Sequence, residues 1–459
     1  MSAPTLKIQG ARFLVTIDRE RRIIQDGAIL VEGQRITQVG KTAEIGAMPA
    51  DRVIDAREMV VTPGFVNGHM HLSYAHAVRG IFPDDLGPAY LPNVFRLQGA
   101  MNEEDEYYTS LLAITELLKY GTTTFLDPGS TKHLDRCMQA YQESGCRIIV
   151  GTHVADRPNP LNLPVSATDS AIRIMEQTVA QYHNTQQGRV QAWSMPFSPQ
   201  YASSELLIAA KDLADRYHTG LTTHHNYSSQ ALEQWIGQHG RRPAQYLEDI
   251  GVLGPNVLLA HALGLNLEEV ECLARTNTRV VACPTAAMKG AAGVTQTGLV
   301  PEMLAKGVVV GLGTDAGNNS NLLETLRSMY LIAVLYKDGR QDWRMIPAET
   351  ALEMATIGGA EALGLADDIG SIEVGKKADL VLFDTKRPEW RAVFNPVNSL
   401  VYNADGRSVH TVIVDGRVVV EAHQPVFVDE WELIQKVQSL GEALLRRTGV
   451  SYPSRWPMV

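Results

Sequence analysis

The chain has 459 residues and carries 41 Lys and Arg against 51 Asp and Glu, which gives a formal net charge of −10. This moderately acidic balance, with no block of like charge, excludes the basic surface that binding to nucleic acid or to an anionic membrane requires. The N-terminus lacks the apolar segment of a secretory signal, and no apolar run approaches the ~20 residues of a membrane span. We therefore expect a cytoplasmic protein that binds neither nucleic acid nor a membrane.

Both ends of the chain carry strand patterns. Apolar and polar residues alternate between Gly-containing turns over 6–16, 27–40 and 51–64, and the same pattern returns over 369–384 and 408–422. Such alternation is typical of antiparallel strands with one buried face. We therefore predict one small, discontinuous β-sandwich domain built from residues 1–61 and 371–428.

Eight short apolar or β-branched runs divide the middle of the chain, with helical patterns between them. The runs are 60–67, 121–127, 147–153, 189–195, 220–226, 256–261, 279–284 and 308–315. Eight strand–helix units in roughly 300 residues favour an α/β fold of the (β/α)8 TIM-barrel type, which we place at residues 62–370. The first strand–helix turn lacks Gly-x-Gly-x-x-Gly, which disfavours a Rossmann fold. Residues 429–459 are predicted to form an amphipathic helix and a tail, a candidate contact for a homo-oligomer of two or more chains.

Histidines gather where these predicted strands end. The residues at strand ends are His69 and His71 after the first, His224 and His225 in the fifth, His261 closing the sixth and Asp315 closing the eighth. Barrel enzymes place their working residues at such ends. Alternate residues of an extended strand share a face, so the rings of His69 and His71 can point at one ion. Three imidazoles and a carboxylate suit Zn²⁺, with Fe²⁺ or Co²⁺ as alternatives.

Five stretches are specific enough to indicate a family. They are TPGFVNGHMHL, ELLKYGTTTFLD, AHALGLNLEEVECLA, GLGTDAGNNS and GGAEALGLADDIGSIEVGKKADLVLFD. Together they resemble the metal-dependent amidohydrolases, in the branch of cytosine deaminase, S-adenosylhomocysteine deaminase and triazine hydrolase. The resemblance covers nearly the whole chain. It implies one divalent metal ion held by His69, His71, His224 and Asp315, with His261 in contact with the substrate.

Because His224 and His225 are adjacent, the choice of the ligand depends on the register of the fifth strand. In the resembled branch the ligand follows a LADELG-like stretch and an apolar strand, and a gapless count from Leu213 reaches His224. A second gapless count, backward from Gly240 and Pro243, also reaches His224. We therefore expect His225 to face the opposite side of the strand, and we keep it as the alternative ligand.

The same register reveals departures from the family pattern. Tyr227 stands where the deaminases carry a Glu that shuttles a proton to the substrate ring. Phe197 replaces a His after the fourth strand, and Ala282 replaces a His at the seventh. An apolar wall leaves the polar groups of a bound purine unpaired, at a cost of roughly 1–3 kcal/mol each. We therefore expect His261, Phe197, Tyr227 and Ala282 to contact a rather apolar substrate.

The leading hypothesis is a metal-dependent hydrolase that cleaves a C–N bond of a small, rather apolar amide, urea or carbamate, near the phenylurea and thiocarbamate hydrolases. The metal would lower the pKa of the attacking water from about 15.7 toward ~7. Asp315 would accept its proton and return it to the leaving amine, and His261 would polarise the carbonyl. Tyr227 would donate a hydrogen bond or form part of the pocket wall.

Two alternatives stay open. One is an aminohydrolase or dechlorinase that acts on an N-heterocycle such as a purine, pyrimidine or triazine, with another group in place of the missing Glu. The other is a non-catalytic barrel that binds a ligand. All the implied ligand residues are present, which disfavours this last alternative. Metal content would separate it from the two enzymes, because protein without bound metal would favour the non-catalytic barrel.

Overall fold

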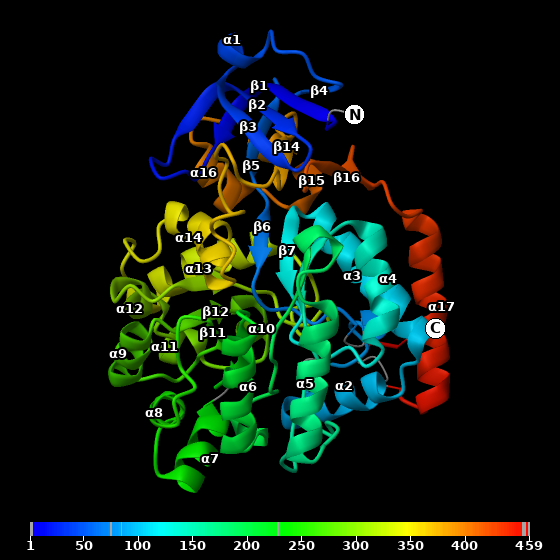
Figure 1. The fold of residues 1–459 in the computed structure, drawn as a ribbon, viewed down its shortest axis with the longest axis vertical. Helices are drawn as coiled ribbons and strands as arrows, with labels where there is room; N and C mark the ends of the chain where they lie inside the picture. The colour runs from blue at the N-terminus through cyan, green and yellow to red at the C-terminus, as the bar shows by residue number, and fades with distance from the viewer. Residues whose placement is uncertain (1–2, 74–75, 84, 227–228, 452–455, 458–459) are drawn as a thin grey trace.

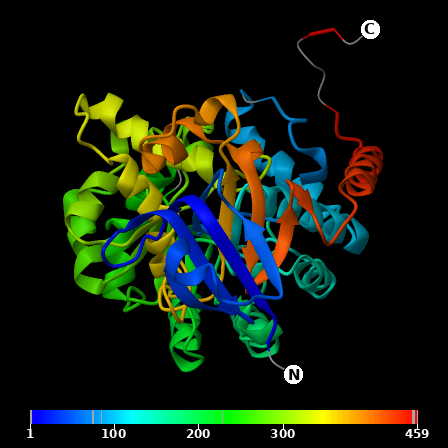
Figure 2. The ribbon, with the colours of Figure 1, turned by 90° about the horizontal axis from the view of Figure 1, so that it is seen from above.

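The structure is a computed structural model of the chain, and it describes residues 3–73, 76–83, 85–226, 229–451 and 456–457. Figure 1 shows a smaller part made of strands, in blue and orange, above a larger part in which helices surround strands. Segments from the two ends of the chain therefore lie side by side, as the view from above in Figure 2 also shows.

Among the described residues, nine strands from the two chain ends form one mixed sheet in the order β17-β16-β15-β14-β5-β1-β2-β3, with β4 paired to β1. They are β1 (Thr5–Val15), β2 (Ile23–Glu32), β3 (Arg35–Lys41), β4 (Arg52–Asp55), β5 (Met59–Pro63), β14 (Leu380–Asp384), β15 (Val409–Val414), β16 (Arg417–Glu421) and β17 (Gln424–Pro425). The antiparallel pair β5 and β14, with Val61 opposite Leu382, joins the two ends. Both side chains are buried in one apolar cluster with Ile8 and Leu14, and this burial specifies the register.

The middle of the chain supplies two parallel sheets of four strands each within the described residues. The first holds β6 (Phe65–Asn67), β7 (Thr122–Leu126), β8 (Arg147–Val150) and β9 (Val190–Ala192), and the second holds β10 (Leu221–His225), β11 (Val257–His261), β12 (Arg279–Ala282) and β13 (Val310–Leu312). Backbone hydrogen bonds link the two sheets at both ends of their order, from Ser194 N to Gly220 O at 3.0 Å and from Gly68 N to Leu312 O at 2.8 Å. Each of the eight predicted strands contains an observed one.

The first predicted strand, 60–67, is wrong in one respect. The structure divides it at Gly64 into β5, which belongs to the nine-stranded sheet, and β6, which begins the parallel sheets. Gly64 N donates to Asp379 O at 2.8 Å, and a Cβ at this residue would lie 2.0 Å from Thr123 Oγ1. A side chain therefore does not fit, and glycine lets the chain pass from one sheet to the other.

Helices pack around the parallel strands (Figure 1). The longer ones are α2 (Tyr90–Gly99), α3 (Glu103–Lys119), α4 (Leu134–Ser144), α5 (Thr168–Tyr182), α6 (Ser204–Arg216), α7 (Ser229–His239), α9 (Leu267–Thr276), α13 (Thr325–Arg340) and α17 (Glu430–Thr448). The shorter ones are α1 (Thr42–Ile45), α8 (Pro243–Asp249), α10 (Pro284–Lys289), α11 (Val294–Thr297), α12 (Val300–Ala305), α14 (Ala348–Met354), α15 (Ile357–Ala362) and α16 (Pro396–Asn398). Local sequence determines where several begin: Asn102 and Asn266 form capping boxes with Asp105 and Glu269.

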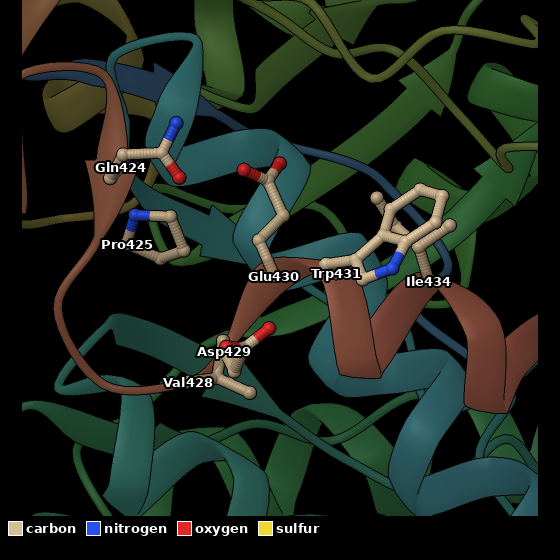
Figure 3. Close-up of a pocket in the computed structure, with 7 residues that line it drawn as sticks. All are labelled: Gln424, Pro425, Val428, Asp429, Glu430, Trp431 and Ile434. Atoms are coloured by element: carbon tan, nitrogen blue, oxygen red, sulfur yellow. The ribbon is translucent and has the colours of Figure 1, made fainter.

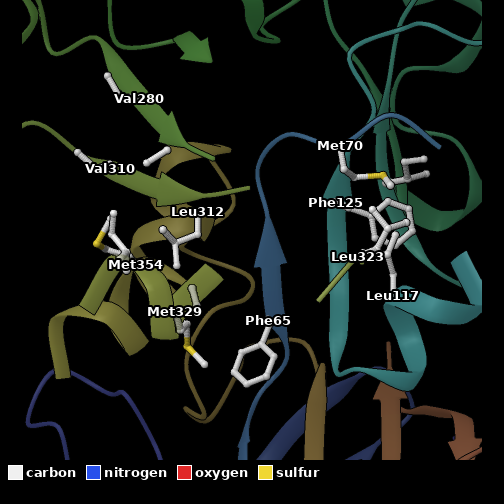
Figure 4. Close-up of a cluster of buried hydrophobic side chains, with 14 of the residues drawn as sticks. Phe65, Met70, Leu117, Phe125, Val280, Val310, Leu312, Leu323, Met329 and Met354 are labelled. Carbon is white, nitrogen blue, oxygen red and sulfur yellow. The ribbon is translucent and has the colours of Figure 1, made fainter. Parts of the chain in front are cut away.

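The main apolar core lies between the parallel strands and these helices. Figure 4 shows a part of it in which Phe65 of β6, Phe125 of β7 and Leu117 of α3 are fully buried. Burial of each such side chain stabilises the fold by roughly 1.5–3 kcal/mol. Because this packing holds β6, it also positions the segment that leads to His69.

The last helix, α17, begins one residue after Asp429, where the sequence pattern predicts an amphipathic helix. Asp429 caps it, and Leu433 and Val437 are buried. An ion pair between Arg447 and Asp105 fastens α17 to the start of α3. Over the part of the chain that the structure describes, no helix combines the length and apolar character that crossing a membrane requires.

A buried ion cluster connects β8 with the nine-stranded sheet. Arg147 Nε lies 2.8 Å from Asp379 Oδ2, and Arg147 Nη2 lies 2.6 Å from Asp415 Oδ1. All three side chains are buried. Separating the two parts of the molecule would leave buried charges without their partners, which is costly. The cluster therefore holds the two parts in one orientation.

Candidate metal centre

Side chains from four strands meet at one end of the parallel sheets. His69 and His71 follow β6, His224 lies in β10, His261 ends β11 and Asp315 follows β13. Ligand atoms within each of two overlapping groups, His69 with His224 and His261, and His69 with His71 and Asp315, lie within 4.8 Å of one another. Residues far apart in the sequence, which we singled out as candidate ligands and as a substrate contact, are therefore adjacent in space.

His69 lies at the centre of this cluster. Its ring centroid is 5.0 Å from that of His71, 4.8 Å from that of His224 and 5.1 Å from that of His261. The side chain is fully buried, and neither ring nitrogen has a hydrogen-bond partner among the described residues. Buried polar groups are costly unless they are satisfied. The orphaned nitrogens, with imidazole and carboxylate donors around them, fit a divalent cation such as zinc.

Hydrogen bonds orient two of the neighbouring rings. His224 Nδ1 lies 2.7 Å from the carbonyl oxygen of Phe197. Since a carbonyl only accepts, Nδ1 carries the proton and Nε2 keeps its lone pair for a metal. His71 Nδ1 lies 2.9 Å from Ser130 Oγ, and His71 Nε2 lies 3.4 Å from Asp315 Oδ1. Both rings are thus held through Nδ1, and for His224 this leaves Nε2 as the ligand atom.

Burial keeps these histidines in the neutral form that binds metals. It lowers the pKa of His224 and of His261 to about 4, and it holds the pKa of His69 and of His71 well below the ordinary value. Burial also raises the pKa of Asp315, against the opposing effect of a hydrogen bond from the Asn319 side chain. A metal binds only deprotonated donors. Because these rings are already neutral at neutral pH, they need not lose a proton before a metal binds.

His225 lies away from the cluster. It stands opposite His261 in the pairing of β10 with β11, but its side chain is influenced by the charges of Glu269 and Arg242 instead. Neither group of candidate ligands in the described chain includes His225. The structure therefore brings His224 to the other rings, as the two register counts expect.

Apolar side chains border the cluster. The ring centroid of Phe197 lies 4.7 Å from that of His224 and 6.1 Å from that of Phe95. Ala282 lines a small cavity together with His261. Tyr227, which we predicted as a catalytic residue and substrate contact, lies outside the described residues. Two of the three departures from the family pattern are thus found beside the candidate ligands.

His153 is a further histidine at this site, and our prediction from the sequence omits it. It follows β8, and its ring centroid lies 5.7 Å from that of His71 and 5.4 Å from that of His224. The signal was present in the sequence, because the third predicted strand, 147–153, ends on a histidine as the sixth does. The same rule that selects His261 would have selected His153.

A cavity of about 430 Å³ lies elsewhere, at the start of α17 (Figure 3). Gln424 and Pro425 of β17 border it together with Trp431 and Ile434 of α17. None of its lining residues belongs to the histidine cluster. We therefore place the chemistry at the cluster.

The comparisons with known proteins agree with this geometry. Residues 60–419 match the amidohydrolase family. The chain is 31% identical over 433 residues to a 5-methylthioadenosine/S-adenosylhomocysteine deaminase of Syntrophobacter fumaroxidans, which covers 94% of this chain and 96% of that protein. It is also 31% identical over 446 residues to a 5'-deoxyadenosine deaminase of Methanobrevibacter smithii, with 97% and 99% covered.

A solved structure is similar over nearly the whole chain. It is a zinc-bound adenosine deaminase from Xanthomonas campestris, with a TM-score of 0.87, 26% identity and coverage of 96% of this chain and 98% of that one. The fold and the site thus define a metal-dependent hydrolase with a TIM barrel and an additional domain. The chain belongs to the amidohydrolase family, as its sequence motifs indicate, and acts on carbon–nitrogen bonds other than peptide bonds.

Proposed function

We propose that this protein is an aminohydrolase that acts on an N-heterocycle, with one zinc ion held by His69, His71, His224 and Asp315. The observation that carries the proposal is the convergence of these side chains around ring nitrogens of His69 that have no partner among the described residues. The relatives named as deaminases of adenosine-type compounds support the heterocycle. From the sequence we kept this class as the alternative, and the relatives named as deaminases support it better than hydrolysis of an amide, urea or carbamate.

We assign a separate role in the reaction to each residue of the site. When bound, a zinc ion supplies Lewis acidity and lowers the pKa of water from about 15.7 toward ~7. Asp315 accepts the proton of the attacking water and returns it to the amino group, which leaves as ammonia. Its carboxylate is oriented by Ala316 N at 2.6 Å and Asn319 Nδ2 at 3.0 Å. His261 hydrogen-bonds the substrate where charge develops. Tyr227 replaces the usual Glu, and we assign it a hydrogen bond to the substrate rather than the transfer of a proton.

The second candidate is hydrolysis of a small, rather apolar amide, urea or carbamate. The contacts of Phe197 with His224 and of Ala282 with the cavity beside His261 favour it. Such a substrate needs no protonation of a ring nitrogen, which suits Tyr227 in place of Glu. An apolar wall also accommodates an aryl or alkyl substituent on a heterocycle, so these contacts are compatible with both candidates.

One experiment separates the candidates. Zinc-loaded protein is incubated with adenosine, 5'-deoxyadenosine and an aminotriazine, and separately with aryl ureas and aryl carbamates, while release of ammonia and of arylamine is measured. Ammonia from the heterocycles supports the proposal, whereas arylamine alone supports the second candidate. Protein that retains no zinc and turns over none of these compounds favours the non-catalytic barrel. Asp315→Asn, which removes the proton acceptor, is the control for adventitious hydrolysis.

We further propose the architecture around this site. The backbone hydrogen bonds that link the two parallel sheets, from Ser194 to Gly220 and from Gly68 to Leu312, support a closed barrel over residues 62–370. The pairing of β5 with β14 supports one discontinuous β-sandwich domain from residues 1–61 and 371–428. Trp431 and Ile434, both exposed, support a homo-oligomer that uses the 429–459 segment. Light scattering of the protein and of a Trp431→Glu variant tests the oligomer. A cytoplasmic location is part of the same proposal.

A further inference from the structure

The position of His153 follows from the strand that precedes it. Ile149 of β8 is buried in the apolar cluster that also holds Trp193 and Met195, which follow β9, and Leu258 of β11. Alternate residues of an extended segment share a face. A Cβ at residue 151 would meet the Met195 side chain at 2.3 Å, so this residue faces the same interior. His153, two residues further on, continues the series at the end of the barrel where the candidate ligands lie.

The backbone at His153 is fixed. His153 N donates to the carbonyl oxygen of Gly129 at 2.7 Å, and Phe197 N donates to Val154 O at 2.9 Å. Gly129 has a φ of +92°, and a Cβ there would lie 2.5 Å from His153 N, so only glycine permits this contact. The imidazole is therefore presented by rigid main chain between β8 and the segment that carries Phe197.

The ring of His153 has polar capacity that the described chain does not use. It packs against Phe197, with centroids 4.9 Å apart, and no hydrogen bond to the ring is found within the described residues. The residue is partly exposed, whereas His69 is fully buried. A neutral imidazole offers one ring nitrogen as a donor and the other as an acceptor.

His153 is distinct from the candidate ligands. Neither group of ligand atoms within 4.8 Å among the described residues includes it. It belongs to the β6–β9 side of the site, whereas His261 ends β11 on the β10–β13 side. A molecule lying over the cluster would therefore meet a polar imidazole from each side, with Phe197 as the apolar wall next to His153.

We propose that His153 is a substrate-contacting residue whose imidazole hydrogen-bonds the polar group of the substrate on the β6–β9 side of the metal centre. This inference rests on the proposed function, and it assigns to His153 the recognition of a ring nitrogen of the heterocycle. His153 thereby supplies polar contact beside Phe197 and Ala282, which stand in place of the family's polar residues. Its loss should weaken substrate recognition and leave the metal in place.

Two variants test the role. His153→Phe keeps a ring of similar size without hydrogen-bonding capacity, and His153→Gln restores an amide. We expect His153→Phe to bind zinc as the unaltered protein does and to lose about tenfold or more in kcat/KM, mainly through KM, with part of the loss regained in His153→Gln. The control is His183→Gln, a histidine of intermediate burial before β9 whose Nδ1 accepts from Ala192 N. Unchanged kcat/KM in His153→Phe, or loss of zinc from it, overturns the proposal.

A binding measurement separates this inference from the proposed reaction. The 13C–1H signal of the His153 ring in zinc-loaded protein is assigned by its absence in His153→Gln, and adenosine, inosine, phenylurea and aniline are then added in turn. A concentration-dependent shift of this signal with any of them supports the contact, even where no turnover is seen and the proposed reaction fails. No shift with all four compounds overturns the contact, even if the protein deaminates adenosine.

Discussion

The Nδ1 atom of His224 lies 2.7 Å from the carbonyl oxygen of Phe197, so the backbone of one predicted pocket residue holds the ring of one predicted ligand. This contact determines which nitrogen of His224 is left for a metal. It also means that the side chain of residue 197 can be changed while its carbonyl is retained. The site can therefore be probed separately for metal binding and for substrate preference.

The adjacent histidines of β10 provide a matched pair for metal binding. We expect His224→Ala to lose most of its zinc, because one imidazole ligand is removed, whereas His225→Ala keeps near-stoichiometric zinc because its ring lies outside the cluster. Metal analysis by plasma mass spectrometry after dialysis against a weak chelator measures both. Loss of zinc from His225→Ala with retention in His224→Ala would reverse our assignment.

Residue 197 should control substrate polarity. Phe197→His places a polar ring where Phe197 now contacts His153 and His224. One additional hydrogen bond to a polar heterocycle is worth about 1 kcal/mol, so we expect kcat/KM for adenosine relative to an aryl urea to rise about fivefold. Phe197→Leu, which stays apolar, is the control and should not raise this ratio. A ratio that is equal in the two variants would show that Phe197 does not contact the substrate.

The ion cluster of Arg147 should contribute to stability far from the site. Arg147→Met removes the hydrogen-bonded cation of two buried carboxylates, Asp379 and Asp415, and leaves only the more distant Lys377 and Arg189 beside Asp415. We expect the free energy of unfolding to fall by about 3–5 kcal/mol. Urea denaturation followed by circular dichroism measures the change. Arg344→Met, which removes an exposed pair with Asp342, is the matched control and should unfold as the unaltered protein does. Equal effects of the two variants would contradict the structural role of the buried cluster.

Asp127 should make stability depend on pH. Burial raises the pKa of Asp127 to about 6, although Gly129 N donates to its carboxylate at 3.0 Å. A carboxyl group whose pKa is higher in the folded state stabilises the fold below pH ~4, and this contribution is lost as the pH rises through 6. From this group we expect a fall of about 3 kcal/mol in the free energy of unfolding between pH 4 and pH 7.

Asp127→Asn removes the titration and tests its sign. The difference in unfolding free energy between the unaltered protein and this variant should change with pH between 4 and 7, and it should favour the unaltered protein more strongly at the acid end. The other titrating groups are shared, so they cancel in this difference. A difference that is constant over the range would show that Asp127 has an ordinary pKa in the fold.

Much of the fold follows from local patterns. Short apolar runs rich in β-branched and aromatic residues mark β5 and β14, and the capping residue Asn102 marks the start of α3, because both signals depend on neighbours in the sequence. The division at Gly64 does not follow from such patterns. It arises because Thr123, nearly sixty residues away, approaches too closely for a side chain.

The candidate site shows the same division. The sequence by itself determined the family and the candidate ligands His69, His71, His224 and Asp315. His69, His71 and Asp315 lie within motifs of contiguous residues, and His224 lies at a fixed count from such stretches. Only the tertiary structure decided that the carbonyl of Phe197 orients His224 and that His153 stands beside Phe197 and His71. The physical reason is that these contacts join separate strands, and their distances are set when the strands pack together around one core.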